Sequence, residues 1–485
     1  MNLLNKLQFD RKDHALLAMI LEILGRRDER KNFKNLLNPY LNAHGIKEMG
    51  ASQSFRIAYA MTNLLQTLEI GKADDRVSAL RSLRYEVMNI THSPLRHNTA
   101  RILLQIMKEL VREADDHSRQ LELAHDFRGA LSGKPRLIRK ELQRYHLLEM
   151  PEEWNQIAFD DHVHDANTKG RKTPTHLIMD AWIKGIRKLT VVYYHYVPKE
   201  AASELLEAGE IMGITIRIGV SIASRFRGAR IRFIWTPRGF SDARDFISFL
   251  SDPHVETFMN EGRQISEGQR RCVLALLAEF NRTHRPVINN AFGLELPPLV
   301  EEDFLSFVAG GQASILHLAE FIHARLLPLM KDRLSELRRR FAEAKEDERD
   351  RIEDLVGKMQ GFDSESIVEQ YLRPVHNPSL PDPSWPWEEE DVPPLLKLSP
   401  GDLMERLDGL HTGYRVCLNL SGLSVNDVLE LLYDCRGRIT HLEIFNLKDY
   451  VAGKAPDYEE IGRLQKALND GNVITLKRLI LGLLK

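Results

Sequence analysis

The strongest constraint on the fold is a change of hydrophobic pattern near residue 150. From Asp13 to about Leu148, apolar residues recur at three- and four-residue spacing, which predicts an all-helical region. After this point, short β-branched and aromatic runs alternate with helical stretches. The sequence therefore predicts an all-helical N-terminal domain, residues 1–150, followed by an α/β domain, residues 151–485.

The α/β part contains several predicted strands, and most of them are followed by a helix. We predict a helix over 199–212 and strands over 189–194, 214–222, 229–235, 414–420 and 440–445. Strands and helices that alternate at this spacing are typical of parallel βα units, either in an open sheet or closed into a barrel. In both architectures functional residues gather at the carboxyl ends of the strands.

Two segments interrupt this alternation. Residues 331–360 are densely charged but keep an apolar stripe, which predicts one long helix at the surface. Residues 374–400 contain eight prolines and are predicted to form an extended surface segment.

Charge and cysteine content narrow the function classes. Lys and Arg number 67 against 69 Asp and Glu, so a uniformly basic, polyanion-binding surface is not expected. Residues 1–150 carry 25 basic and 18 acidic side chains, a net charge of +7. Because this excess is modest and scattered, we expect most of these charges to lie on solvated helix faces rather than to form a surface for nucleic acid or an acidic partner. Three cysteines without CxxC spacing fit a cytoplasmic protein. No apolar run of about 18 residues occurs, so no membrane span is expected.

Three histidines are the candidate metal ligands. His162 and His164 lie two residues apart near the end of a predicted strand, and His195 ends the next one. Imidazoles placed in this way could reach one divalent ion (Zn, Mn or Fe), with Asp165 or solvent as a further ligand. Any one of these histidines alone would more commonly be a surface or core residue.

Basic residues near these strand ends are the candidate substrate ligands. Arg171 and Lys172 belong to the loop after the histidine pair, and Arg225, Arg227 and Arg230 lie just past the third predicted strand. Such side chains could neutralise a phosphate group, so a phosphorylated small molecule or nucleotide is the predicted substrate. The alternative for Arg225 and Arg227 is a solvated hairpin with charged edges.

Several of these segments together resemble the PHP (polymerase and histidinol phosphatase) domains. The similar segments are DHVH at 161–164, TPTHLIMDAWIKGIRKLTVVYYHY at 173–196 and EAASELLEAGEIMGITIRIGVSI at 200–222, with weaker similarity in SILHLAEFI at 314–322 and ITHLEIFN at 439–446. The resemblance implies a distorted seven-stranded βα barrel with two or three metal ions that hydrolyses phosphate esters by a metal-activated water.

The chain departs from the pattern of that family at several ligand positions. Tyr194 and Ser221 stand where the family has carboxylates, and Asn419 stands where it has a histidine. The closing Asp-x-His strand of the family is not found before Lys485, so the barrel is expected to be incomplete. Because these ligands are missing, we expect a site for a single metal ion, formed by His162, His164 and His195.

The sequence therefore predicts one of two functions. The first is a metal-dependent phosphoesterase with His162, His164 and His195 as the catalytic metal ligands. The alternative is a catalytically inactive PHP-like binding or scaffold protein that contacts protein partners through its N-terminal helices and insertions.

Overall fold

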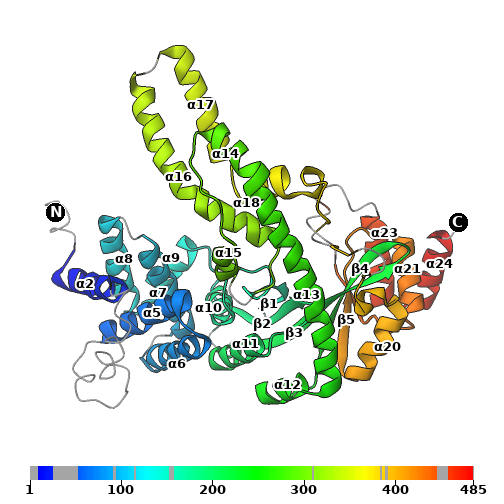
Figure 1. Ribbon diagram of the computed structural model, residues 1–485. Coiled ribbons are helices and arrows are strands. Elements are labelled where there is room, and N and C mark those ends of the chain that lie inside the picture. Colours follow the sequence, from blue (N-terminus) through cyan, green and yellow to red (C-terminus); the bar gives the residue numbers. More distant parts are fainter. Residues whose placement is uncertain are drawn as a thin grey trace. The chain divides into compact units, whose positions relative to one another are not determined.

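The computed structural model describes residues 9–483 apart from 26–52, 91–93, 114–115, 152–157, 309–310, 344, 383–384, 388–390, 445–449 and 451–456. It has a mixed α/β structure (Figure 1), which confirms the predicted class. The chain divides into two compact units. Unit 1 comprises 1–163, 172–191 and 200–217, and unit 2 comprises 164–171, 192–199 and 218–485.

Unit 1 is rich in helices, and the described part of the predicted helical region consists of helices joined by short loops. The helices are α2 (Arg11–Gly25), α5 (Gln53–Ile70), α6 (Ala73–Ile90), α7 (Arg96–Arg112), α8 (His117–Ala130), α9 (Pro135–Arg144), α10 (Pro174–Lys184) and α11 (Lys199–Met212). The centre of this core is α7, whose Leu103, Ile106 and Leu110 are fully buried. The helix predicted over 199–212 coincides with α11.

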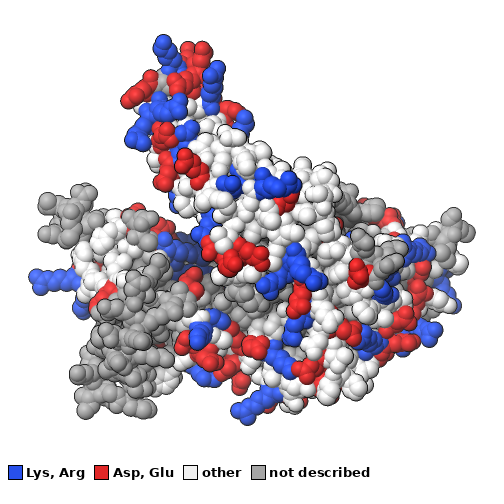
Figure 2. Space-filling view, in the orientation of Figure 1, with Lys and Arg blue, Asp and Glu red and all other residues white. Residues whose placement is uncertain are grey.

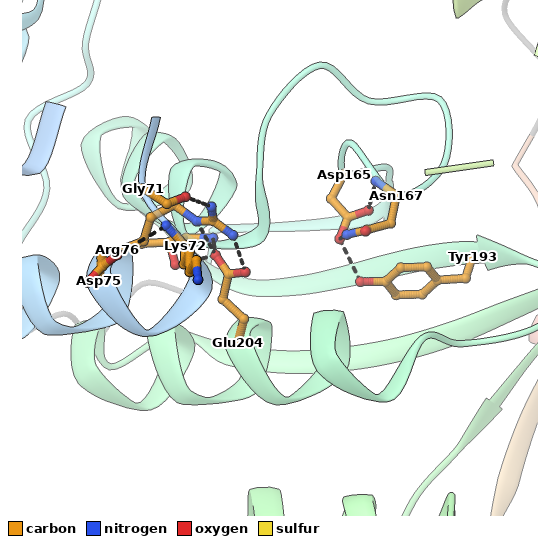
Figure 3. A network of polar contacts seen from close by, with 9 residues as sticks. Gly71, Lys72, Asp75, Arg76, Asp165, Asn167, Tyr193 and Glu204 are labelled. Atoms are coloured by element: carbon orange, nitrogen blue, oxygen red, sulfur yellow. Dashed lines mark hydrogen bonds and ion pairs between the residues drawn. The ribbon is translucent and has the colours of Figure 1, made fainter. Parts of the chain in front are cut away.

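Two buried polar networks fix α10 within unit 1. The Arg76 guanidinium donates two hydrogen bonds to the Glu204 carboxylate, of 2.8 and 2.6 Å (Figure 3). Glu204 also accepts hydrogen bonds from the backbone N–H and the hydroxyl of Thr175 at the start of α10. Arg101, which is fully buried on α7, donates to the carbonyl oxygens of Ile183 at 2.7 Å and Leu148 at 2.9 Å. These contacts satisfy helix-end groups that would otherwise be buried without partners.

The six described strands form one sheet in the order β1-β2-β3-β4-β5-β6. They are β1 (Ala158–Val163), β2 (Ile186–Tyr194), β3 (Thr215–Phe226), β4 (Ala229–Pro237), β5 (Tyr414–Leu418) and β6 (His441–Leu442). The β1–β2 and β5–β6 pairs are parallel. Since β1 and β6 end this order, the described strands form an open sheet, and the ring of seven strands implied by the PHP resemblance is not closed among them.

Strand β4 departs from the predicted parallel βα pattern, because it runs antiparallel to both β3 and β5. The cause is a tight turn: Phe226 pairs with Ala229, and the two residues between them, Arg227 and Gly228, have φ angles of 49° and 78°. Two successive positive φ angles give the turn that joins antiparallel strands with the correct twist. Strands β3 and β4 therefore form a hairpin, and the substrate role of Arg225 and Arg227 stays a prediction.

Unit 2 adds a set of helices around the later strands. They are α12 (Ala243–Phe249), α13 (Pro253–Glu279), the π-helix η1 (Phe280–His284), α14 (Arg285–Phe292), α15 (Glu301–Val308), α16 (Ile315–Glu343), α17 (Glu346–Gln360), α18 (Ser364–Ile367), the π-helix η2 (Val368–Leu372), the short 3₁₀ helix η3 (Pro374–His376), α19 (Pro394–Lys397), α20 (Pro400–Leu410), α21 (Val425–Asp434), α23 (Tyr458–Asn469) and α24 (Val473–Leu483).

The single long helix predicted over 331–360 is wrong. Helix α16 ends at Glu343 and α17 begins at Glu346, and the two lie side by side as a hairpin (Figure 1). The apolar stripe explains this arrangement, because Leu337 of α16 and Ile352 and Met359 of α17 are buried in one hydrophobic cluster. Lys, Arg, Asp and Glu side chains are intermixed over the hairpin tip (Figure 2).

The Pro-rich segment agrees with its prediction where it is described. Within 374–400 the helical elements are the three-residue η3, the four-residue α19 and the first residue of α20, while 383–384 and 388–390 lie outside the described residues. Trp385 and Trp387 contact each other edge to face at 5.5 Å. Across the described parts of the chain, every helix is too short or too polar to cross a lipid bilayer.

Candidate functional site

A cationic and aromatic cluster in unit 2 is the candidate functional site. We call it the Tyr194 site, and it consists of His164, Lys169, Tyr194 and Arg232. Tyr194 is the last residue of β2, Arg232 lies on β4, and the other two belong to the loop after β1. His164, Lys169 and Tyr194 therefore lie at or just after the ends of the first two strands, and Arg232 lies within β4.

The loop that carries His164 and Lys169 is folded around Asp165. The fully buried Asp165 carboxylate accepts the Tyr193 hydroxyl at 2.6 Å and the Asn167 backbone N–H at 2.9 Å (Figure 3). The Asp165 carbonyl accepts the Gly170 N–H at 2.8 Å. A side chain at Gly170 would meet the His164 carbonyl at 2.2 Å, so the turn requires glycine.

His164 is held between the loop and Tyr194. Its Nδ1 donates to the Val192 carbonyl at 2.7 Å, which leaves Nε2 as an acceptor 3.3 Å from the Tyr194 hydroxyl. The two rings are stacked, with centroids 5.1 Å apart and an interplanar angle of 20°. Burial raises the pKa of Tyr194 to about 12, so the phenol stays neutral at physiological pH.

Two cations lie over the Tyr194 ring. The Lys169 ammonium is 4.7 Å and the Arg232 guanidinium carbon 5.6 Å from the ring centroid. Arg232 lies directly opposite Ala223 on β3. Among the described residues, no carboxylate forms an ion pair with Arg232, which makes it a cation available to a ligand.

Two further arginines share the face of Arg232. Arg225 and Arg230 lie opposite each other on β3 and β4, and alternate residues of a strand point to the same side of a sheet. Arg230 stacks on Trp385 at 4.6 Å. Burial lowers the pKa of Arg230, with Arg232 adding to that effect and Asp382 opposing it. The face of β3 and β4 that carries Arg232 therefore holds three arginines.

His195 directly follows β2, as predicted, but it lies in the interior. It has a φ of 63°, and its N–H donates to the Ser221 carbonyl at 3.0 Å. Its own carbonyl oxygen lies close to α13: a Cβ atom added at Gly262 would be 2.1 Å from it. The His195 Nδ1 is buried without a hydrogen-bond partner among the described residues. Burial, and secondarily Arg232, lower the pKa of His195 to about 3.

The predicted ligand set does not come together as a metal centre. In the part of the chain that the structure describes, no three His, Cys, Asp or Glu side chains are grouped so that they could hold a metal ion. His162 is exposed on β1, both nitrogens of His164 are engaged, and the Asp165 carboxylate is used in the loop. Metal binding by His162, His164, His195 and Asp165 therefore stays a prediction from the sequence, without support from this geometry.

The charge of the site also disfavours a metal ion. A divalent cation at the His164 Nε2 would be bound next to the Tyr194 ring, which already contacts the positively charged Lys169 and Arg232. The residues present therefore do not fit the metal that the PHP resemblance implies, and they fit an anion.

The other predicted substrate ligands are mostly paired with acids. Arg171 donates to Glu320 at 2.6 Å, Lys172 forms an ion pair with Asp180 in unit 1, and Arg227 forms one with Glu430. Their substrate role stays a prediction, as does that of Arg225. Lys169, Tyr194 and Arg232 were missed as ligands. The alternation of Arg230 and Arg232 with the apolar Ile231 and Phe233 was the available signal, since it places both arginines on the polar side of a strand.

Comparisons with known proteins add little. No model of a protein family and no curated protein matches the chain. Similar solved structures include a candidate metal-dependent phosphoesterase from Bifidobacterium adolescentis, with 12% identity and a TM-score of 0.37 over 63% of this chain and 82% of that one. An amidohydrolase from Chromobacterium violaceum with bound sulfate and no metal has 13% identity and a TM-score of 0.37 over 64% and 84%. Likeness at this level carries no conclusion about activity.

Proposed function

We propose that unit 2 binds the phosphate group of a small phosphorylated molecule at the Tyr194 site, without a metal ion. The observation that carries the proposal is Arg232, whose guanidinium contacts the Tyr194 ring, as the Lys169 ammonium does, and forms no ion pair with a described carboxylate. This binding function differs from the alternative drawn from the sequence, which is a scaffold that contacts protein partners through its N-terminal helices and insertions.

The chemistry of the three side chains suits a phosphate. A guanidinium presents paired N–H donors that match two phosphate oxygens, and the Lys169 ammonium adds a second positive charge. The Tyr194 ring orients both cations and excludes water from one side. Because burial keeps the pKa of the Tyr194 phenol near 12, that group adds no repelling negative charge at neutral pH.

Metal-dependent hydrolysis of phosphate esters is the second candidate function. One observation favours it: the His164 Nδ1 donates to a backbone carbonyl, an arrangement that commonly orients the other imidazole nitrogen toward a metal. The 3.3 Å contact of this nitrogen with the Tyr194 hydroxyl and the nearby cations oppose it.

One set of measurements separates the two functions. Purified protein in EDTA is titrated with phenyl phosphate, and its melting temperature and phosphate release are followed before and after Zn²⁺ or Mn²⁺ is added. Binding predicts a rise in melting temperature in EDTA that is smaller in Arg232→Ala, with no phosphate release. The matched control is Arg227→Ala, since Arg227 lies in the same hairpin but pairs with Glu430. Phosphate release that requires added metal would establish hydrolysis instead.

A further inference from the structure

A second group of cations lies in unit 1, outside the Tyr194 site. Two ammonium groups bind the two oxygens of one buried carboxylate: Lys108 of α7 donates to Asp180 Oδ1 at 2.5 Å, and Lys172 bonds to Oδ2. Further residues lie one helical turn away, at positions 112, 176 and 184. We call the group the Asp180 cluster, and it consists of Lys108, Arg112, Lys172, His176, Asp180 and Lys184.

The charges of this cluster do not balance. Four basic side chains surround one carboxylate, which leaves an excess of three positive charges with a neutral imidazole. Arg112 and Lys184 are both exposed and form no ion pair with a described residue. The Lys108 side chain is only 13% exposed, so its charge is poorly hydrated.

The lowered pKa values of three residues in the cluster agree with an excess of positive charge. Burial and the neighbouring cations lower the pKa of Lys108 and of Lys172, each to about 8. The same causes lower the pKa of His176 to about 4, so its ring is neutral at pH 7. The helix dipole does not account for Lys172, which precedes the positive N-terminal end of α10, whereas Arg112 and Lys184 lie in the last turns of α7 and α10, where a cation is favourable.

One polar atom of the cluster lacks a partner. The His176 Nε2 is buried, has no hydrogen bond within the described chain, and lies 3.9 Å from Asp180 Oδ2, too far for a hydrogen bond. A buried polar atom without a partner beside excess positive charge is typical of a site completed by a ligand.

We propose that the Asp180 cluster binds a phosphate group, with Arg112 and Lys184 as the outer ligands. Lys108 and Lys172 supply the inner charge that attracts the anion, and the neutral His176 ring can donate a hydrogen bond from Nε2. This site is in unit 1, so it does not depend on the function proposed for unit 2. The phosphate could be free inorganic phosphate or the phosphate of a monoester.

The test counts sites by isothermal titration calorimetry at pH 7.5 in EDTA, with the full-length chain. The background is Arg232→Ala, which removes the site proposed in unit 2. In this background, inorganic phosphate is expected to bind at one site, and the added double substitution Arg112→Ala/Lys184→Ala is expected to weaken it by about tenfold or more. The control pair is Arg136→Ala/Lys140→Ala, two exposed basic residues on α9.

The outcomes distinguish this site from the Tyr194 site. Equal phosphate affinity in the Arg112/Lys184 and control variants would overturn the proposal, whatever the behaviour of unit 2. Loss of binding in the Arg112/Lys184 variant alone supports it, even if Arg232 proves to have no ligand. Tighter binding of adenosine monophosphate than of phosphate, with no binding of adenosine, would identify a monoester as the source.

Proton uptake gives a second readout. A bound anion stabilises the charged lysines and raises their pKa values from about 8, so phosphate binding at pH 8 should take up protons. Titrations in buffers with different ionisation enthalpies measure this uptake. Phosphate binding without proton uptake would place the anion away from Lys108 and Lys172 and would contradict the proposal.

Discussion

The guanidinium carbon of Arg232 lies 5.6 Å from the centroid of the Tyr194 ring, within the range of a cation–π contact. The PHP resemblance implies a metal-binding carboxylate at position 194, so an aromatic ring there changes the chemistry of the site. A carboxylate would attract a metal, whereas the ring holds two cations and favours an anion.

The Tyr194 ring, more than its hydroxyl, should support phosphate binding. Tyr194→Phe keeps the surface under Lys169 and Arg232 and loses one hydrogen bond to His164, worth about 1 kcal/mol of folding stability. Tyr194→Ala removes the surface itself and should weaken phenyl phosphate binding by about tenfold. Calorimetry of both variants checks this. Equal loss in the two would show that the hydroxyl binds the ligand.

Asp165 should act as a structural residue. Asp165→Asn replaces the buried acceptor of the Tyr193 hydroxyl and the Asn167 N–H, and should lower the free energy of unfolding by about 2 kcal/mol. Urea unfolding measures this loss, and the exposed Asp160→Asn is the control. An Asp165→Asn variant with full stability that loses metal-dependent activity would instead support the ligand role predicted from the sequence.

Arg101 should be important for the stability of unit 1. Arg101→Met keeps the volume but leaves the buried carbonyls of Ile183 and Leu148 without their donor, at a cost of about 3 kcal/mol in the free energy of unfolding. Denaturant unfolding followed by circular dichroism checks this, with the exposed Arg136→Met as control. If both variants lower the free energy of unfolding only slightly and by similar amounts, the structural role of Arg101 would be contradicted.

His195 should make the protein less stable in acid. Its pKa is lowered to about 3 in the folded state, while an unfolded histidine titrates near 6.5. Between these values the unfolded chain binds the additional proton, so the free energy of unfolding falls as the pH is lowered from about 6.5 toward 3. His195→Asn, which tolerates the positive φ, should flatten this dependence.

The measurement for His195 is urea unfolding over the pH range 4–7. The control is His146→Asn, because His146 also has a positive φ, of 53°, but is exposed. An unchanged pH dependence in His195→Asn would show that the pKa of this imidazole is the same in the folded and unfolded chain.

Much of the fold could be predicted from the sequence because it depends on local periodicity. The helix over 199–212 and the strand before His195 follow from apolar spacing alone. The break between α16 and α17 could not be predicted in this way, since one apolar stripe suits both a single helix and a hairpin that packs on itself. Which partner covers the stripe is decided by tertiary packing.

The site was only partly predictable for a related reason. The sequence indicated the strand ends and the basic loop but not which charges remain unpaired there. Arg171 and Arg227 find acidic partners far along the chain, at Glu320 and Glu430, whereas Arg232 has none among the described residues. Pairings of this kind depend on long-range packing, which residue spacing does not encode.

The most direct test of the account is a calorimetric titration with phenyl phosphate in EDTA. The background is Arg112→Ala/Lys184→Ala, so that unit 2 alone is measured. The account predicts binding at one site, weakened about tenfold or more by Arg232→Ala and unchanged by Arg227→Ala. Binding that needs added metal, or that is the same with and without Arg232, would contradict it.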